Sequence, residues 1–146
     1  MQLVPVICVD GPSCAGKGSL ARRLADRLGF HLLDSGALYR VVGHVASECG
    51  VAWDDELGLE AIAASLDVIF EPIDDGVGVF HEGVDVSIPI RSVRGGEGAS
   101  AVAVFPKVRQ ALLARQRELA VAPGLIADGR DMGSCLLYTS PSPRDA

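Results

Sequence analysis

The sequence contains little lysine, few aromatic residues and no long apolar run. Only Lys17 and Lys107 among the thirteen basic residues are lysines, and aromatic residues make up 5% of the chain. Nineteen acidic residues leave a net charge of −6, which argues against a nucleic-acid partner because neutralising phosphates requires a basic face. No apolar run approaches the roughly 18–20 residues that a membrane span needs. The N-terminus has no basic segment and meets a charged Asp10 too early for a signal peptide, so we expect a cytoplasmic protein with no membrane partner.

The four cysteines also exclude two classes of protein. They form no C-x-x-C pair and no spacing suited to zinc, so the sequence predicts neither a disulfide framework nor a structural metal. The length of 146 residues suits one domain. A composition of 49% hydrophobic and 22% charged residues is typical of a globular chain rather than a disordered one.

Alternating strand and helix patterns predict an α/β fold with a parallel sheet. The run 4–9 is short, apolar and β-branched, as in a buried parallel strand. A helix is expected over 16–28, where Leu20, Leu24 and Leu28 recur four residues apart and mark a face packed on the sheet. The same reasoning predicts further strands at 30–33 and 125–127, and helices at about 35–49, at 54–66 and from Pro106 onward.

The middle of the chain follows a different pattern. Short apolar runs at 68–70, 77–80 and 84–86 are separated by Asp-Asp-Gly and Glu-Gly turn signals, which predicts a small antiparallel insert. The segment 91–98 (RSVRGGEG) is polar and rich in glycine, so we expect it to be a connector without regular structure.

The segment 11–17 (GPSCAGK) matches G-x-x-x-x-G-K between an expected strand and an expected helix. Small residues allow successive backbone N–H groups to surround a phosphate, and the helix N-terminus adds positive potential. The Lys17 ammonium is a mobile charge suited to the β- and γ-phosphates of a nucleotide. The predicted phosphate-binding residues are Gly11, Pro12, Ser13, Cys14, Ala15, Gly16, Lys17, Gly18 and Ser19. Position 18 is glycine where the general motif has Ser or Thr. This variant of the motif resembles that of the nucleoside-monophosphate kinases.

Four separated motifs together resemble the bacterial cytidylate kinases, in order and spacing over residues 1–133. They are GPSCAGKGS, LLDSGALYR, SAVAVFPKVRQALLARQR and GLIADGRDMG. The resemblance implies an α/β P-loop NTPase fold of the nucleoside-monophosphate kinase type, in which an insert at about 67–100 binds the monophosphate. It also implies a monomer that transfers the γ-phosphoryl group of ATP to CMP or dCMP with Mg²⁺.

The resemblance assigns a role to each motif residue. It implies catalytic roles for Lys17 and Arg130 and a Mg²⁺ site at Ser19 and Asp128, the latter possibly through water. The residues that it implies for CMP binding are Ser35, Tyr39, Arg40, Ser100, Arg109, Arg130 and Asp131. An arginine such as Arg40 can hold a phosphate with two parallel hydrogen bonds, and a carboxylate such as Asp131 suits the cytosine amino group.

For Arg109 and Ser35, the residue type alone fits more than one role. We expect a buried Arg109, whose planar fork of donors fits the cytosine acceptors or the monophosphate equally well. Ser35 is also expected to cap the helix that follows it. The residues Lys107, Arg115 and Arg117 are expected to be solvated helix residues, and the three histidines to be structural or exposed. No general base is required, because the acceptor phosphate is already anionic.

The chain departs from the resembled family in two respects. Cys14 stands where the family usually has glycine, and a Cβ there costs on the order of 1 kcal/mol if the backbone needs a positive φ. The family also continues past GRDMG with further strands and a lid that carries arginines. We therefore expect a truncated domain over 1–133 that lacks these parts, with 134–146 a non-native or disordered tail, because YTSPSPRD resembles a translated sequencing adapter.

Truncation has two expected consequences. The phosphate-loop strand becomes an exposed sheet edge, so the chain folds marginally or aggregates, and turnover falls at least ~10³-fold without lid arginines. Two other functions remain open at this point. One is a nucleotide-binding P-loop module without catalysis. The other is a P-loop kinase with another small acceptor, against which DSGALYR together with IADGRDMG argues.

Overall fold

The computed structural model describes residues 4–10, 17–73 and 76–129. Among the helices of these described residues, none is long and apolar enough to cross a bilayer. The strands are β1 (Val6–Asp10), β2 (His31–Asp34), β3 (Val68–Ile73), β4 (Gly76–His81), β5 (Val84–Asp85) and β6 (Leu125–Gly129). The helices are α1 (Lys17–Leu28), α2 (Ser35–Cys49), α3 (Glu56–Ala64), α4 (Ser87–Arg91), α5 (Val93–Ala103) and α6 (Pro106–Glu118).

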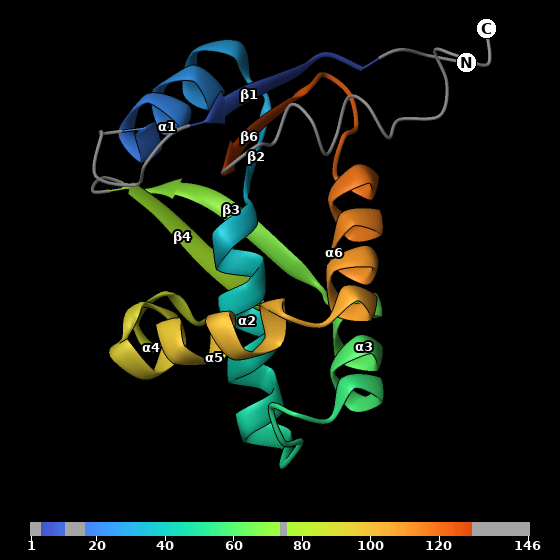
Figure 1. The fold of residues 1–146 in the computed structure, drawn as a ribbon. Coiled ribbons are helices and arrows are strands. Elements are labelled where there is room, and N and C mark those ends of the chain that lie inside the picture. Colours follow the sequence, from blue (N-terminus) through green and yellow to red (C-terminus); the bar gives the residue numbers. More distant parts are fainter. Residues whose placement is uncertain (1–3, 11–16, 74–75, 130–146) are drawn as a thin grey trace, which may run out of the picture.

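A parallel sheet forms one end of the molecule, with the strand order β1-β6-β2 (Figure 1). The central strand β6 is buried along its whole length, as expected for a strand that pairs on both sides. Ala127 lies opposite Cys8 of β1 and Leu33 of β2. Because the three strands are parallel, their carboxyl ends meet at the same edge of the sheet. β1 lies at one side of the described sheet, which is where the resemblance places the phosphate-loop strand when further strands are absent.

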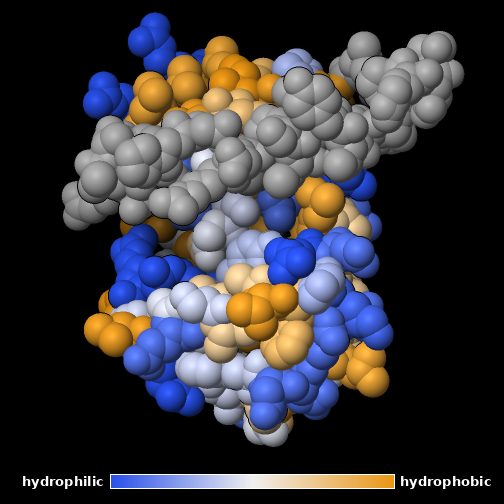
Figure 2. Space-filling view, in the orientation of Figure 1, coloured by the Kyte–Doolittle hydropathy of each residue, from blue (hydrophilic) through white to orange (hydrophobic). Residues whose placement is uncertain are grey.

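Helix α1 packs on this sheet mainly through small residues. Ala21 and Ala25 are 1% and 3% exposed, whereas Leu20 and Leu28 are 50% and 46% exposed. The helix was predicted correctly, but of the predicted buried leucines only Leu24 packs against the core, and it is partly buried; the prediction was wrong for Leu20 and Leu28. Alanine lets the helix axis come close to the sheet, and the leucines then project to the side, where Figure 2 shows hydrophobic residues on the surface over α1.

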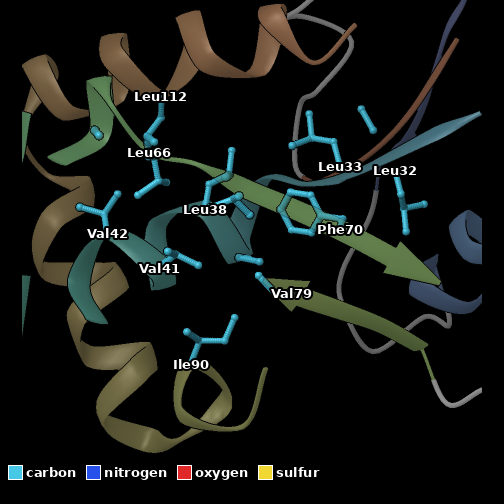
Figure 3. Close-up of a cluster of buried hydrophobic side chains, with 14 of the residues drawn as sticks. Leu32, Leu33, Leu38, Val41, Val42, Leu66, Phe70, Val79, Ile90 and Leu112 are labelled. Atoms are coloured by element: carbon cyan, nitrogen blue, oxygen red, sulfur yellow. The ribbon is translucent and has the colours of Figure 1, made fainter. Parts of the chain in front are cut away.

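The expected antiparallel insert is present as the sheet β3-β4-β5. Phe70 of β3 lies opposite Val79 of β4, and both side chains are buried. In Figure 3 these two residues face Leu38 and Val41 of α2, which are 2% and 0% exposed. One apolar face of α2 therefore packs against the antiparallel sheet and contributes much of the core.

The segment 91–98 is helical, so the prediction of an irregular connector there was wrong. The Ser92 hydroxyl caps α5 by accepting a hydrogen bond from the Gly95 N–H at 3.0 Å. A Cβ at Gly95 would lie 2.2 Å from the Ile90 carbonyl oxygen, and a Cβ at Gly98 would lie 2.9 Å from the Trp53 ring. These glycines are needed for close packing of α5 against its neighbours, and they are not signals for chain flexibility.

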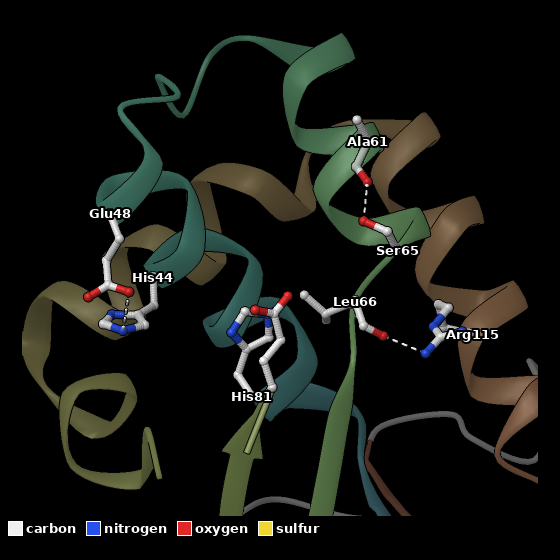
Figure 4. A network of polar contacts seen from close by, with 8 residues as sticks. His44, Glu48, Ala61, Ser65, Leu66, His81 and Arg115 are labelled. Carbon is white, nitrogen blue, oxygen red and sulfur yellow. Dashed lines mark hydrogen bonds and ion pairs between the residues drawn. The ribbon is translucent and has the colours of Figure 1, made fainter. Parts of the chain in front are cut away.

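Helices α3 and α6 pack side by side (Figure 1). Leu59 of α3 and Leu112 of α6 are both fully buried. Arg115 of α6 donates one hydrogen bond to the Leu66 carbonyl and another to Glu118; the first is drawn in Figure 4. Arg115 therefore connects α6 to the segment just after α3 through a hydrogen bond. The prediction that Arg115 is a solvated helix residue was wrong.

The other expectations about surface residues have mixed outcomes. Lys107 is exposed, as predicted, but Arg117 is only half-exposed and its Nε atom is buried. His44 lies 3.5 Å from Glu48 (Figure 4) and His81 lies 3.9 Å from Glu82. The Nε2 atom of the exposed His31 lies 2.9 Å from the Ala122 carbonyl oxygen. The three histidines thus lie on separate elements; the partners of His44 and His81 are close in the sequence, whereas that of His31 is distant.

Adjacent glycines of α5 provide a matched test of this packing. Gly95→Ala is expected to lower the free energy of unfolding by about 1–3 kcal/mol, because its Cβ overlaps backbone of α4. Gly96→Ala places a Cβ in ordinary contact with Arg40 and is expected to be neutral or to stabilise by up to about 1 kcal/mol through helix propensity. Urea unfolding of both variants measures the difference, and equal effects would contradict the packing described above.

The turn between β5 and α4 makes stability depend on pH. The Ser87 hydroxyl and N–H hydrogen bond to the Asp85 carboxylate and lower its pKa. A lowered pKa in the folded state gives stability that is present above the ordinary aspartate pKa and is lost as the pH falls through the folded value. We therefore expect Asp85→Asn to destabilise the protein at pH 7 and to have progressively less effect towards pH 2. Urea unfolding across this pH range tests it, and a constant difference would contradict it.

Candidate active site

The carboxyl edge of the parallel sheet carries the flanks of the phosphate-binding motif. β1 ends at Asp10 and α1 begins at Lys17, so the strand and helix that the motif requires are both present. Lys17, Gly18 and Ser19 form the start of α1, where backbone N–H groups lack partners within the helix. The other predicted phosphate-binding residues lie outside the described residues; they are Gly11, Pro12, Ser13, Cys14, Ala15 and Gly16.

Two aspartates lie side by side at the same edge. Asp128 near the end of β6 is in register with Asp34, the last residue of β2, and the Asp128 side chain is buried at 8% exposure. Asp34 caps α2, because its carboxylate accepts a hydrogen bond from the Ala37 N–H at 3.2 Å. The prediction that Ser35 caps this helix was therefore wrong: Ser35 is the first helical residue, and the residue before it occupies the capping position.

The Asp128 carboxylate has the oxygen chemistry that Mg²⁺ prefers. Within the described part of the chain, no group of three or more metal-binding side chains occurs. A Mg²⁺ ion that accompanies a nucleotide needs only one or two protein carboxylates, since phosphates and water supply its other ligands. Asp128 at the sheet edge fits that requirement, and Ser19 lies on the neighbouring helix start.

Helix α2 links this edge to a second group of polar residues. It starts directly after β2, with no intervening loop, so its position is fixed by the sheet. Arg40 comes five residues after Ser35, which places it about 7.5 Å farther along the helix axis. The Arg40 Nη1 atom donates a hydrogen bond to the Ile90 carbonyl at 2.7 Å, and its guanidinium lies beside Gly96 of α5. Tyr39, the residue before it, is half-buried against the core.

Two further predicted acceptor residues, Ser100 and Arg109, also lie at α5. Ser100 is exposed and lies one helical turn after Gly96. Arg109 is exposed rather than buried, contrary to expectation: its Nη1 atom donates to the Ala103 and Val104 carbonyls at 2.8 and 2.9 Å. These carbonyls lie at the end of α5, where they lack partners within the helix. The Arg109 guanidinium therefore lies against them at the surface instead of in the core. The structure thus brings Arg40, Ser100 and Arg109 to one helix, whereas Arg130 and Asp131 lie outside the described residues.

Sequence reasoning missed the residues that support this group. The Ile90 carbonyl holds Arg40, and Gly96 leaves room for its guanidinium. A backbone carbonyl gives no signal in a sequence. The glycines at 95, 96 and 98 did give one, and their spacing on a single helix could have indicated close packing.

Comparison with known proteins identifies the family. The family model described as cytidylate kinase matches residues 7–142. The chain belongs to the cytidylate kinase family. A cytidylate kinase from Shewanella pealeana is 54% identical over 143 residues, covering 97% of this chain and 62% of that relative. The cytidylate kinases from Aeromonas hydrophila (54% identical, 91% of this chain, 58% of the relative) and Proteus mirabilis (55%, 90% and 59%) are similar to it as well.

The described structure agrees with membership of the cytidylate kinase family. It has an α/β fold with a parallel sheet and the strand-to-helix junction of a P-loop kinase. The chain spans about three-fifths of the length of the curated relatives it matches.

Proposed function

We propose that this chain carries the nucleotide sites of an enzyme that transfers the γ-phosphoryl group of ATP to CMP or dCMP. The observation that carries this proposal is the position of Arg40. It lies about one and a half helical turns from the start of α2, and α2 starts at the same carboxyl edge of the sheet at which β1 leads into the phosphate motif. This places an arginine for the acceptor phosphate on an element anchored at the donor edge, as alignment of a donor with an acceptor nucleotide requires.

The donor side consists of the phosphate-loop residues 11–19. Backbone N–H groups of this loop would surround the ATP phosphates, and the Lys17 ammonium would pair with the β- and γ-phosphates. Asp128 and Ser19 would hold Mg²⁺, Asp128 through water, and the ion would neutralise charge on the phosphate oxygens. Because Asp128 is buried at the end of a central strand, its position is set by the sheet.

The acceptor side consists of residues from α2, α5, α6 and the segment after β6. Arg40 would bind the CMP phosphate with the donors that the Ile90 carbonyl leaves available. Ser35 and Tyr39 would contact the acceptor nucleotide from the same helix, while Ser100, Arg109 and Asp131 would recognise it from the other side. Arg130 would contact the phosphates during transfer. The reaction needs alignment and positive charge rather than a general base, because the attacking phosphate oxygen is already anionic.

The proposed reaction is tested by an acceptor panel. The purified chain is titrated calorimetrically with CMP and with ATP·Mg²⁺, and ADP release is then measured with CMP, dCMP, UMP and AMP. We expect binding of both nucleotides, and ADP release that is faster with CMP and dCMP than with UMP and AMP. A full-length relative such as the Shewanella pealeana enzyme is the positive control.

Two results would contradict the proposed reaction. A folded chain that binds neither nucleotide is not a nucleotide kinase. Binding of both nucleotides without ADP release, in an assay that detects a rate on the order of 10⁵-fold below that of the full-length relative and so allows for the loss of lid arginines, would favour the nucleotide-binding module instead.

The role of Arg40 is tested against a matched arginine. Arg40→Ala is expected to raise the CMP Kd about 10- to 100-fold, which corresponds to the loss of charge-assisted hydrogen bonds to a phosphate. Arg115→Ala is the control, because Arg115 also donates to a backbone carbonyl from a half-exposed position but lies six residues after Arg109 on α6, about 9 Å farther along the helix axis, at the Leu66 carbonyl. It should lower stability by about 1 kcal/mol and leave the CMP Kd unchanged. Equal CMP affinities of the two variants would contradict the assignment of Arg40.

A further inference from the structure

Trp53 lies in the loop between α2 and α3, and its side chain contacts both α2 and α5. Its indole Nε1 atom donates a hydrogen bond to the Gly43 carbonyl of α2 at 3.0 Å. Its ring lies against Gly98 of α5, where a Cβ would come within 2.9 Å of the ring. The same ring lies under the guanidinium of Arg94, whose Cζ atom is 4.6 Å from the ring centroid. One side chain thus holds α2 by a hydrogen bond and α5 by two contacts one turn apart.

The two helices touch through glycines at this point. A Cβ at Gly43 would lie 3.0 Å from the Gly98 carbonyl carbon, so Gly98 lies between the α2 backbone on one side and the indole on the other. Gly43 and Gly98 themselves provide no side chain that would prevent sliding or rotation at this point. The stacking of Arg94 and the fit of Trp53 against Gly98 supply that restraint.

The proposed acceptor residues depend on the same two helices. Arg40 is one turn before the Gly43 contact on α2 and lies beside Gly96 of α5. Ser100 follows Gly98 by two residues on α5, and Arg109 holds the end of that helix. A small shift of α5 along α2 would change the spacing of Arg40 and Ser100 and leave the parallel sheet edge in place.

We propose that Trp53 is a positioning residue for the acceptor nucleotide, acting through the α2–α5 contact without touching the nucleotide. This inference rests on the proposed function, since it assumes that CMP binds between α2 and α5. It predicts an effect on CMP affinity that is separate from any effect on ATP affinity.

The test is calorimetric titration of variants that circular dichroism shows to be folded at the assay temperature. Trp53→Ala is expected to raise the CMP Kd about tenfold and to leave the ATP·Mg²⁺ Kd within twofold of the unaltered chain. Trp53→Phe keeps a ring under Arg94 but loses the N–H donor, so its CMP Kd should lie between the two. Gly98→Ala, which pushes α5 away from the indole, should weaken CMP binding as Trp53→Ala does.

Leu59→Ala is the control for general loosening. Leu59 is buried in α3, a helix that packs mainly on α6 and carries none of the proposed acceptor residues; its truncation should lower stability and leave the CMP Kd unchanged. A folded Trp53→Ala with unaltered CMP affinity overturns the inference, and so does an equal rise in Leu59→Ala. If Trp53→Ala does not fold, the CMP Kd values of Trp53→Phe and Gly98→Ala test the inference instead: unaltered CMP affinity in both folded variants overturns it.

The fluorescence of the unaltered chain provides an independent readout. Trp53 is the one tryptophan in the sequence, so its emission reports on the α2–α5 contact without any substitution. We expect CMP to change the emission with the Kd found by calorimetry, and no change at CMP saturation overturns the inference. If the unaltered chain does not bind CMP at all, the proposed function fails and the positioning role fails with it; if it binds CMP and Trp53→Ala binds equally well, the positioning role alone fails.

Discussion

The close approach of α2 and α5 is the interaction on which the arrangement of the site depends. It requires glycine at positions 43 and 98, because a Cβ at either one would overlap a neighbour at 3.0 Å or less. Helices that pack this closely gain dispersion contacts over their backbones, which favours one relative position. Arg40 and Ser100 lie on these two helices, so their spacing depends on this contact, beside which the Arg40 guanidinium lies against Gly96.

Helix α2 is the element that connects the two halves of the candidate site. It starts at the carboxyl edge of the parallel sheet, where Asp34 ends a strand and caps the helix at the same time. It then passes the antiparallel sheet, which covers one of its faces, before it meets α5 (Figures 1 and 3). The helix begins at the carboxyl edge of the sheet and carries Arg40 about 7.5 Å farther along its axis. No loop lies between this edge and Arg40.

The sequence predicted the elements better than it predicted their buried faces. The strand-to-helix junction around the phosphate motif, the antiparallel insert and the helix that starts at Pro106 all depend on local patterns, and the structure has each of them. The predicted buried face of α1 was wrong for Leu20 and Leu28, because hydrophobic spacing alone cannot tell whether leucine or alanine faces a sheet. The helix α5 was missed because glycine usually ends helices, and its value for packing appears only once the neighbouring helix is known.

In the candidate site, likewise, the residues could be predicted but their contacts could not. Motif resemblance indicated Arg40, Ser100 and Arg109, and the structure places them around one helix. It could not indicate that Arg109 is exposed or that a carbonyl of Ile90 holds Arg40, because these contacts arise between segments far apart in the chain. The cap of α2 is a local feature that was open to prediction, and it was assigned one residue too late, to Ser35 instead of Asp34.

The most direct test of this account is a map of backbone amide NMR shifts with each nucleotide. We predict that CMP changes the amide shifts of α2 around Arg40 and of α5 from Gly96 to Ser100, and that ATP·Mg²⁺ changes those at the start of α1 and at the end of β6. Shifts caused by CMP that cluster elsewhere, or that leave α5 unaffected, would contradict the claim that the α2–α5 contact forms the acceptor site.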